Sequence, residues 1–199
     1  MSKTFLDKAY DLDGVEATQQ LYSDWSKSYD QEVSDNGYVT HNRIAEALAK
    51  VVPSNVRLLD FGCGTGLSGL ALRAAGFEQI DGCDISQDML EQAKHKNAHD
   101  NLAVVEPGYV PTGYDAIAAI GVIGAGAAPI ETFDQILDAL EPGGVFATSF
   151  NDHALDHPEF ATKVEAVLRA RTAHLVYQDY GDHLPGINLN SMIYVLVKN

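Results

Sequence analysis

The sequence predicts an α/β protein in which helices cover both faces of a doubly wound, mostly parallel, seven-stranded sheet. Two observations lead to this fold class. From residue 56 onward, short apolar runs alternate with amphipathic segments, which is the pattern of strands joined by helical crossovers. The last two apolar runs are separated only by residues 181–190, a connection too short for a crossover, so we expect an antiparallel C-terminal hairpin.

Helical periodicity marks the N-terminal part of the chain. Tyr22, Trp25 and Tyr29 fall at i, i+3 and i+7, which places them on one face of a helix. A second helical segment with apolar residues between 44 and 51 stops before Pro53. The chain has 199 residues, which suits one domain with a small appendage. We therefore expect an N-terminal helical cap segment over residues 1–53 and one domain over residues 54–199.

The remaining elements follow in order along the chain. The expected strands are residues 56–61, 79–84, 102–105, 115–120, 145–150, 175–180 and 192–197. The expected helices are residues 67–75 closed by Gly76, one capped by Ser86 and carrying Met89, one over residues 130–140 stopped by Pro142, and one with Pro158 in its first turn. Ligands of such open sheets bind beyond the carboxyl ends of the strands.

Charge and composition exclude several classes of partner. Thirteen basic and 28 acidic residues give a net charge of −15, and the basic cluster Lys94-His95-Lys96 is too small to attract a line of phosphates. We therefore expect neither nucleic acid nor an anionic membrane as a partner. The apolar stretch 114–130 is interrupted by an acid, glycines and a proline, which argues against a spanning helix. Two cysteines and no signal-peptide core indicate a cytoplasmic setting.

A glycine-rich turn follows the first predicted strand. The run Asp60-Phe61-Gly62-Cys63-Gly64-Thr65-Gly66 leads directly into a helix, and glycines allow a ligand to approach the backbone closely. Another strand ends in Asp84, a carboxylate that can accept both hydroxyls of a ribose. This combination favours a nucleoside-binding site, although such turns also occur as plain connections.

The spacing within this turn distinguishes between nucleoside cofactors. The dinucleotide fingerprint G-x-G-x-x-G/A fails at Leu67, and no G-x-x-x-x-G-K-[ST] run occurs. Asp60 would oppose a pyrophosphate, but it could orient the loop and meet a cationic amino group directly or through water. S-adenosylmethionine carries an amino-acid end, a sulfonium and a ribose without phosphate, so it fits the local charge better than NAD does.

At these residues the sequence resembles the class I S-adenosylmethionine-dependent methyltransferases, which implies a Rossmann-like fold. The resemblance is carried by residues 60–66, Asp84-Ile85-Ser86, Met89-Leu90, Tyr114-Asp115-Ala116-Ile117 and Leu140-Glu141-Pro142-Gly143-Gly144. The run 21–30 is similar to a Y-x-x-W-A-x-x-Y-D element of the Williams–Beuren-region methyltransferase-like proteins and their bacterial relatives, and Leu184-Pro185-Gly186 and residues 193–196 also fit that group.

The resemblance implies a role for each matching residue. Gly62, Cys63 and Gly64 would back the methionine end of the cofactor, and Asp84 would hold the ribose. Ile85 would flank the adenine, with Met89 closing the pocket. The implied cofactor-binding residues are Tyr22, Tyr29, Asp60, Gly62, Cys63, Gly64, Asp84, Ile85 and Met89. The connection Glu106-Pro107-Gly108 is unusually short, so either the backbone or Glu106 could meet the adenine amine.

Other reactive residues give weaker signals. Cys63 and Cys83 are interpreted as packing residues, and the scattered histidines predict no metal site. Asn151-Asp152-His153 follow a strand at the edge of the sheet where ligands are expected to bind, and a histidine there could accept a proton. The sequence is equally consistent with an exposed loop histidine that has no such role. Asp182 and His183 are weaker candidates still. No catalytic residue is assigned.

The implied reaction is transfer of a methyl group from S-adenosylmethionine to a small-molecule acceptor, with S-adenosylhomocysteine as product (EC 2.1.1.-). The sulfonium is already a good leaving group, so the protein mainly aligns the reactants and excludes water. Gly121-Val122-Ile123-Gly124 replaces the Asn/Asp-Pro-Pro-Tyr/Phe run of amino-group DNA methyltransferases. Two alternative functions stay open: a cofactor-binding protein without transferase activity, and an NAD(P)-dependent oxidoreductase. A protein side chain also stays open as the acceptor. The acceptor atom, the need for a general base and the oligomeric state are not predicted.

Overall fold

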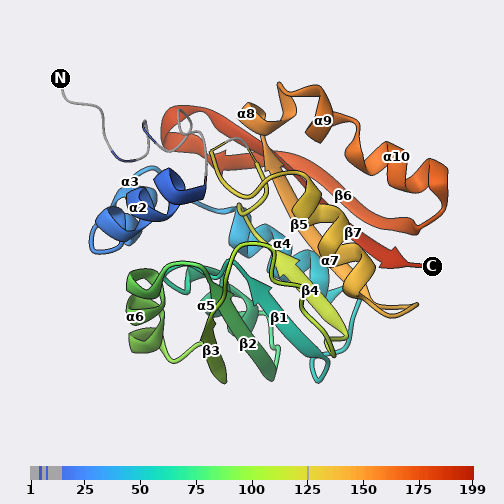
Figure 1. Cartoon of the computed structure of the whole chain (residues 1–199), viewed down its shortest axis with the longest axis horizontal. Helices are drawn as coiled ribbons and strands as arrows, with labels where there is room; N and C mark the ends of the chain where they lie inside the picture. Colours follow the sequence, from blue (N-terminus) through green and yellow to red (C-terminus); the bar gives the residue numbers. More distant parts are fainter. Residues whose placement is uncertain (1–4, 6–7, 9–14, 125) are drawn as a thin grey trace.

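A seven-stranded sheet with the order β3-β2-β1-β4-β5-β7-β6 forms the centre of the molecule (Figure 1). The computed structural model describes residues 5, 8, 15–124 and 126–199. The strands are β1 Arg57–Phe61, β2 Gln79–Asp84, β3 Asn101–Val104, β4 Ala116–Ala119, β5 Val145–Asn151, β6 Ala173–Leu184 and β7 Leu189–Lys198. Strands β1 to β5 are parallel, whereas β7 runs antiparallel between β5 and β6. The predicted fold class and C-terminal hairpin are confirmed.

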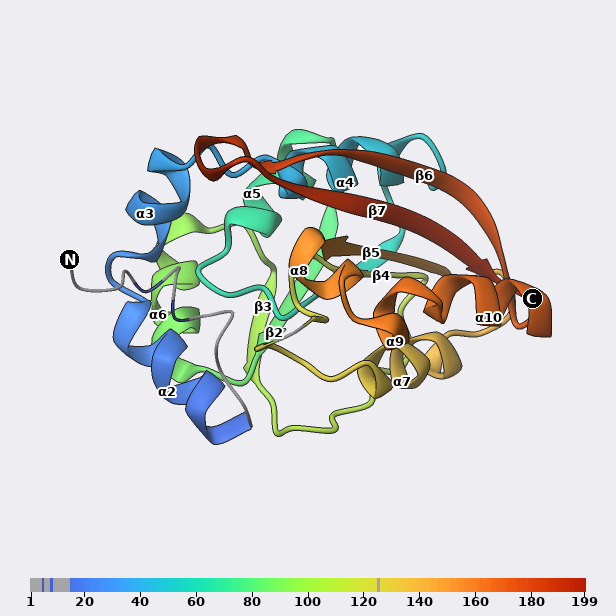
Figure 2. The same ribbon diagram turned by 90° about the horizontal axis from the view of Figure 1, so that it is seen from above.

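Helices lie on both faces of the sheet (Figure 2). The helices are α2 Val15–Trp25, α3 Tyr29–Asp35, α4 Thr40–Ala49, α5 Leu67–Ala74, α6 Gln87–Lys96, α7 Glu131–Ala139, α8 Asp152–Leu155, α9 Pro158–Ala161, α10 Lys163–Ala170 and the 3-10 turn η1 Pro185–Ile187. Apolar residues of α4 and α5 pack on one face of the sheet, and those of α7, α9 and α10 pack on the other. Within the part of the chain that is described, no helix is both long and apolar enough to cross a membrane.

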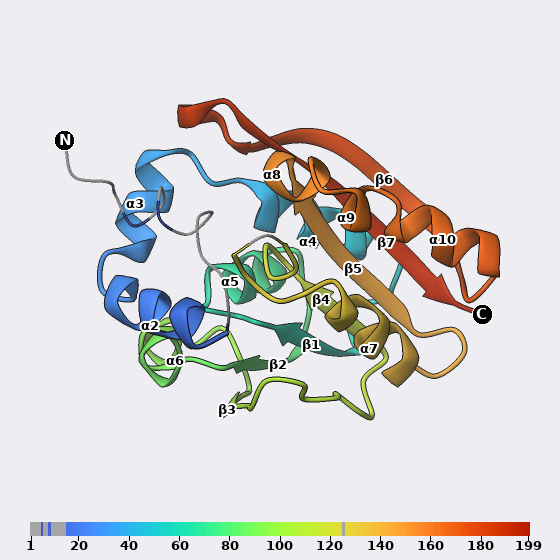
Figure 3. The same ribbon diagram turned by 45° about the horizontal axis from the view of Figure 1, so that its top comes forward.

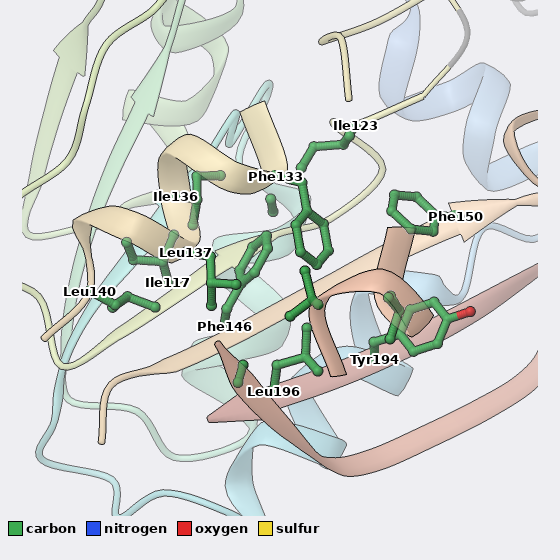
Figure 4. Packing of buried hydrophobic residues seen from close by; sticks show 14 of the residues in the cluster. Ile117, Ile123, Phe133, Ile136, Leu137, Leu140, Phe146, Phe150, Tyr194 and Leu196 are labelled. Atoms are coloured by element: carbon green, nitrogen blue, oxygen red, sulfur yellow. The ribbon is translucent and has the colours of Figure 1, made fainter. Parts of the chain in front are cut away.

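Aromatic rings make up the centre of the core beneath α7 (Figure 4). Phe133 of α7 meets Phe146 of β5 edge-on, with ring centroids 5.0 Å apart, and Phe150 packs on Tyr194 of β7 at 5.9 Å. Burial of one such side chain contributes about 1.5–3 kcal/mol. This packing holds β5 and β7 together and fixes where β4 and β5 end, which is the edge that carries the polar residues discussed below.

The N-terminal aromatic residues come from two helices rather than one. Helix α2 ends at Trp25, and α3 begins at Tyr29 after a turn closed by the Ser28 amide on the Trp25 carbonyl at 2.9 Å. The prediction of a single helical face is therefore wrong. The rings still meet, with Trp25 5.8 Å from Tyr22 and 4.7 Å from Tyr29, because the turn brings the second helix back toward the first.

The C-terminal hairpin is longer than predicted. Residues 181–190 were expected to form a loop, but β6 continues to Leu184 and β7 begins at Leu189. The extension pairs β6 with β7 up to Leu184 and Leu189, and Arg43 of α4 contacts it. Its guanidinium donates to the carbonyls of Asp179, Gly181 and Asp182 at 2.8–3.0 Å, which occupies acceptors on β6 at the edge of the sheet. The predicted helix at Pro158 is also interrupted, at Thr162 between α9 and α10.

Candidate functional site

A cavity of about 240 Å³ opens at the carboxyl ends of β1, β2 and β4. Figure 3 shows β1 and β2 pointing toward the end of the molecule where α2 and α6 lie side by side. Eight of the nine predicted cofactor-binding residues are in the cavity wall, namely Tyr22, Tyr29, Gly62, Cys63, Gly64, Asp84, Ile85 and Met89. The ninth, Asp60, is not among the lining residues.

The glycine-rich turn crosses from the end of β1 to α5 with an unusual backbone. Gly62 and Gly64 have φ values of +69° and +53°, a region that L-residues with a side chain rarely adopt. The amides of Gly62 and Cys63 both donate to the Cys83 carbonyl, at 2.8 and 3.0 Å, which ties the turn to the end of β2. The left-handed backbone conformation of the turn therefore requires glycine at these positions. Because glycine has no side chain, the backbone of the turn is uncovered on the side of the cavity.

Alanine at Gly62 should cost at least about 1 kcal/mol more stability than alanine at Gly64. Both substitutions strain a left-handed backbone by roughly 1–2 kcal/mol. Only at Gly62 would the new Cβ lie 2.5 Å from Val122, whereas no atom lies within 4 Å of a Cβ at Gly64. Urea unfolding of the two variants measures the difference. Equal losses would show that Val122 moves aside without cost.

Asp84 is fixed at the end of β2 by two main-chain donors. Its Oδ2 accepts from the Gly64 amide and its Oδ1 from the Ser86 amide, both at 2.9 Å. Burial raises the pKa of Asp84, and these two hydrogen bonds oppose that shift. A carboxylate oxygen can accept more than one hydrogen bond. The side chain is therefore oriented in advance and retains acceptor capacity toward the cavity.

Asp60 lies beneath the turn instead of in the cavity wall. Its side chain is fully buried, and Oδ2 accepts from Ser68 Oγ at 2.6 Å and lies 2.9 Å from His99 Nε2. Of the two roles expected for Asp60, orientation of the loop agrees with this geometry, and direct contact with a ligand in the cavity does not. Sequence reasoning missed His99, which follows α6 and carries no motif.

Two glycines make room for the His99 ring. A Cβ at Gly69 would lie 2.4 Å from the ring and one at Gly82 2.8 Å from it, so both positions need glycine for this close approach. Cys63 Sγ adjoins the same slot, and Asp60, Cys63 and His99 bring three potential metal-ligand atoms within 4.8 Å of one another. Because His99 and Asp60 are already joined by a direct hydrogen bond, we interpret this cluster as a buried polar network, in which Asp60 Oδ1 and His99 Nδ1 have no partner among the described residues.

The two cysteines are buried as free thiols. Burial raises the pKa of Cys83 to about 12 and that of Cys63 well above its ordinary value, with Asp60 and Asp84 adding to both shifts. Such thiols stay protonated at neutral pH and are poor nucleophiles. This agrees with the interpretation of both residues as packing residues.

Helix α2 covers one side of the cavity. Gln19 Nε2 donates to the Ile85 carbonyl at 2.9 Å, and Thr18 Oγ1 donates to the Gly126 carbonyl at 3.2 Å. Burial raises the pKa of Tyr22 to about 12, and the charge of Asp84 contributes a smaller part of this increase. The helix is thus hydrogen-bonded both to the turn after β2 and to the segment between β4 and α7, and Tyr22 enters the site as a neutral phenol.

The other predicted candidates are distributed around this site. Glu106, Pro107 and Gly108 line the cavity, as expected for the short connection after β3. Asp152 is engaged elsewhere, since its carboxylate accepts from Tyr180 Oη at 2.8 Å and the Asn190 amide at 2.9 Å. The described wall also includes Tyr38, Thr132 and Gln135, which no sequence signal had marked.

His183, a weak candidate in the sequence, is 7% exposed at the end of β6 and lines a second, smaller cavity. Burial, reinforced by the Arg43 charge, lowers the pKa of His183 from 6.5 to about 4. The unfolded chain therefore binds a proton at a pH where the folded protein does not. His183 should remove up to about 3 kcal/mol of stability as the pH falls from 7 to 4.

Denaturant unfolding between pH 4 and 7 tests this linkage. The free energy of unfolding should rise with pH in the wild type and should rise less in His183→Gln. His95→Gln, which removes an exposed histidine of α6, serves as the matched control. Parallel pH profiles for His183→Gln and the wild type would contradict the assignment.

Comparison with known proteins agrees with this geometry. The profile of a family described as Methyltransferase domain matches residues 36–183. Methyltransferase-like protein 27 from Homo sapiens is 32% identical over 149 residues, covering 70% of this chain and 60% of the relative. Trans-aconitate 2-methyltransferase from Rhodopseudomonas palustris is 31% identical over 137 residues, covering 65% and 52%. The chain thus spans only about half to three fifths of the length of these relatives.

A solved S-adenosylmethionine-dependent methyltransferase from Thiobacillus denitrificans, in complex with S-adenosyl-L-homocysteine, has the same fold, with a TM-score of 0.58. It is 16% identical and covers 79% of this chain and 91% of the other. The chain belongs to the methyltransferase-domain family, and the predicted resemblance to the class I methyltransferases, with their Rossmann-like fold, is confirmed. The narrower likeness to methyltransferase-like proteins agrees with the first of these relatives.

Proposed function

We propose that the chain binds S-adenosylmethionine in the cavity at the ends of β1 and β2 and transfers its methyl group to a small-molecule acceptor. The observation that carries the proposal is the fixed position of the Asp84 carboxylate in the cavity wall. Its carboxylate is held by the Gly64 and Ser86 amides in the same wall as the glycine-rich turn. A carboxylate next to a bare backbone is the combination that a ribose diol with a neighbouring sulfonium would need.

Each part of the cofactor has a matching surface. Asp84 would accept the ribose hydroxyls, and Ile85 and Met89 would pack on the adenine. Gly62 to Gly64 would support the methionine end, under the cover of Tyr22 and Tyr29. Asp60 would act from below by orienting the turn. Glu106, or the backbone next to it, would meet the adenine amine.

Charge supports this cofactor over a dinucleotide. No described residue in the cavity wall is a lysine or an arginine, and the chain carries a net charge of −15. A pyrophosphate would find no cationic partner there, whereas a sulfonium and an ammonium group would be stabilised by the nearby carboxylates. An NAD(P)-dependent oxidoreductase is therefore disfavoured.

The chain itself would contribute alignment and exclusion of water. S-adenosylmethionine supplies an activated methyl group when bound. Asp84 and the glycine-rich turn would hold the donor at two ends, and the apolar wall with Val122 and Tyr22 would keep water from competing with the acceptor. The acceptor would enter as the nucleophile that takes the methyl group from the donor. No fixed general base is required where the acceptor loses its proton late.

A small acceptor agrees with the shape of the site. Helix α2 covers one side of the cavity, which would leave less access for a polymer than for a small molecule, and the acidic surface opposes nucleic acid. One relative is named for the small molecule trans-aconitate. Residues 54–199 would form the cofactor-binding domain, with residues 1–53 as its cover. The buried free thiols fit a reducing, cytoplasmic compartment.

Calorimetry with S-adenosylmethionine, S-adenosylhomocysteine, NADH and NADPH tests the cofactor. Both adenosyl compounds should bind with 1:1 stoichiometry, and neither nicotinamide should. Transfer of label from methyl-labelled S-adenosylmethionine to a panel of small acids, phenols and amines then tests the reaction. Binding without a methylated product across the panel would favour a cofactor-binding protein over an enzyme.

A further inference from the structure

A second cavity of about 60 Å³ adjoins the first one and shares Tyr22, Tyr29 and Tyr38 with its wall. Its own wall adds Ser149 and Asn151 at the end of β5 and His183 at the end of β6, so polar side chains from two strands face the same small space. The proposed cofactor site uses none of these three groups.

The imidazole of His183 is hydrogen-bonded through only one of its two ring nitrogens among the described residues. Its Nδ1 lies 2.8 Å from Thr40 Oγ1, and its ring packs edge-on against Tyr38 with centroids 5.2 Å apart. No hydrogen bond from Nε2 reaches another residue in the described part of the chain. Since His183 forms part of the cavity wall, Nε2 is the nitrogen left for a ligand.

A chain of hydrogen bonds determines which nitrogen carries the proton. Thr40 Oγ1 lies 3.0 Å from Ser191 Oγ, and Arg43 Nη1 donates to Ser191 Oγ at 3.0 Å. A guanidinium can only donate, so Ser191 Oγ accepts from Arg43. The Ser191 hydroxyl then donates to Thr40 Oγ1, and the Thr40 hydroxyl donates to His183 Nδ1. The reverse order would leave the proton of the fully buried Ser191 without an acceptor among the described residues.

The ring is therefore a neutral donor at physiological pH. Nδ1 accepts from Thr40, which puts the proton on Nε2. Burial lowers the pKa of His183, and Arg43, His153 and His41 act in the same direction, whereas the Asp152 charge opposes them. An uncharged Nε2–H donates a hydrogen bond and cannot take up a proton, so His183 is excluded as a general base in this state.

Asn151 adds a second donor to the same wall. Its Oδ1 accepts from the Ala154 amide at 3.0 Å as the N-cap of α8, and its NH₂ group makes no hydrogen bond to another described residue. Ser149 Oγ accepts from the Gly121 amide at 3.0 Å. The Nε2–H of His183 and the NH₂ group of Asn151 thus give the wall of the second cavity two hydrogen-bond donors.

We propose that the second cavity is an acceptor subsite in which His183 Nε2–H and the Asn151 amide bind a carbonyl or carboxylate oxygen of the methyl acceptor. This proposal rests on the proposed function, since the shared tyrosine wall would place the rest of that molecule beside the methyl donor. His183 would act as a specificity-determining residue that favours acceptors with an exposed oxygen.

Nitrogen-15 spectra of the histidine side chains in the full chain test the proposal, recorded with and without S-adenosylhomocysteine. His183 should remain neutral with its proton on Nε2 between pH 6 and 8. Acetate and acetamide should shift the Nε2 resonance in a saturable manner, and methylammonium, which only donates hydrogen bonds, should not. A stronger effect of acetate than of acetamide would identify a carboxylate as the ligand, and equal effects a carbonyl.

Thr40→Val removes the donor to Nδ1 while keeping the size of the side chain. Without this donor, His183 should no longer favour the tautomer with the proton on Nε2, and acetate binding should weaken at least about tenfold. A proton on Nδ1 in the wild type, a response to methylammonium, or no saturable response to any probe would overturn the proposal, and none of these readings needs a variant to fold. Because the titration also runs without cofactor, a failure of S-adenosylhomocysteine to bind contradicts the proposed function separately.

Discussion

Replacement of Asp84 by alanine should weaken S-adenosylmethionine binding by about 10- to 100-fold or more. A hydrogen bond to a charged group contributes about 1.5–3 kcal/mol, and this carboxylate would accept two of them from the ribose. The same substitution also frees the Gly64 and Ser86 amides that now hold the turn. Calorimetric titration of the wild type and the variant measures the loss directly.

Asp81→Ala provides a matched control for this experiment. Asp81 lies on the same strand and also accepts hydrogen bonds, from Arg57 and Asn101, but it is outside the cavity wall. Its loss should lower stability slightly and leave the affinity within about twofold of the wild type. Thermal unfolding of both variants separates folding from binding. Wild-type affinity in Asp84→Ala would contradict the ribose assignment.

Replacement of His99 by alanine should lower the free energy of unfolding by about 3–5 kcal/mol. The side chains of His99 and Asp60 are 0% and 1% exposed, and their bond is 2.9 Å long. Removal of one member leaves the other in an apolar interior without its partner, which is the costly way to break a buried pair. Denaturant unfolding measures the change, and the affinity for S-adenosylmethionine should fall with it because Asp60 supports the turn.

His95→Ala is the matched control, because His95 is exposed on α6 and should cost less than about 0.5 kcal/mol. Addition of Asp60→Asn to His99→Ala should recover part of the loss, since a neutral amide tolerates burial better than an unpaired carboxylate does. A double-mutant cycle gives the coupling energy between the two side chains. Strict additivity would mean that the two residues do not act as a pair.

The fold was predictable because its signals are local in the sequence. The central parallel strands β1, β4 and β5 are buried along most of their length, so each reads as a short, mainly apolar run, and the helices between the strands show a 3.6-residue period. The Ser86 cap lies within three residues of its partner, the Met89 amide. The glycine-rich turn and the acid at the end of β2 are likewise contiguous motifs, and eight of nine expected residues line one cavity.

The parts that sequence reasoning missed depend on contacts between distant residues. His99 and Asp60 are 39 positions apart, and Thr40 and His183 are 143 positions apart. Arg43 supports the end of β6 from across the sheet, which no local pattern reveals. The break between α2 and α3 escaped because the aromatic residues keep a helical spacing across it.

These observations give two layers to the proposed site. The upper layer faces the cavity and is built from bare backbone, Asp84 and tyrosine rings. The lower layer, made of Asp60, Ser68 and His99, holds the turn in place from inside the protein. The first layer would determine what binds, and the second would keep the backbone in its binding shape.

A crystal structure of the full chain with S-adenosylhomocysteine tests the central claim most directly. The ligand should occupy the cavity above the ends of β1 and β2, with both ribose hydroxyls on the Asp84 carboxylate and the homocysteine end over Gly62 to Gly64. Ligand density at another place, or a ribose turned away from Asp84, would contradict the account.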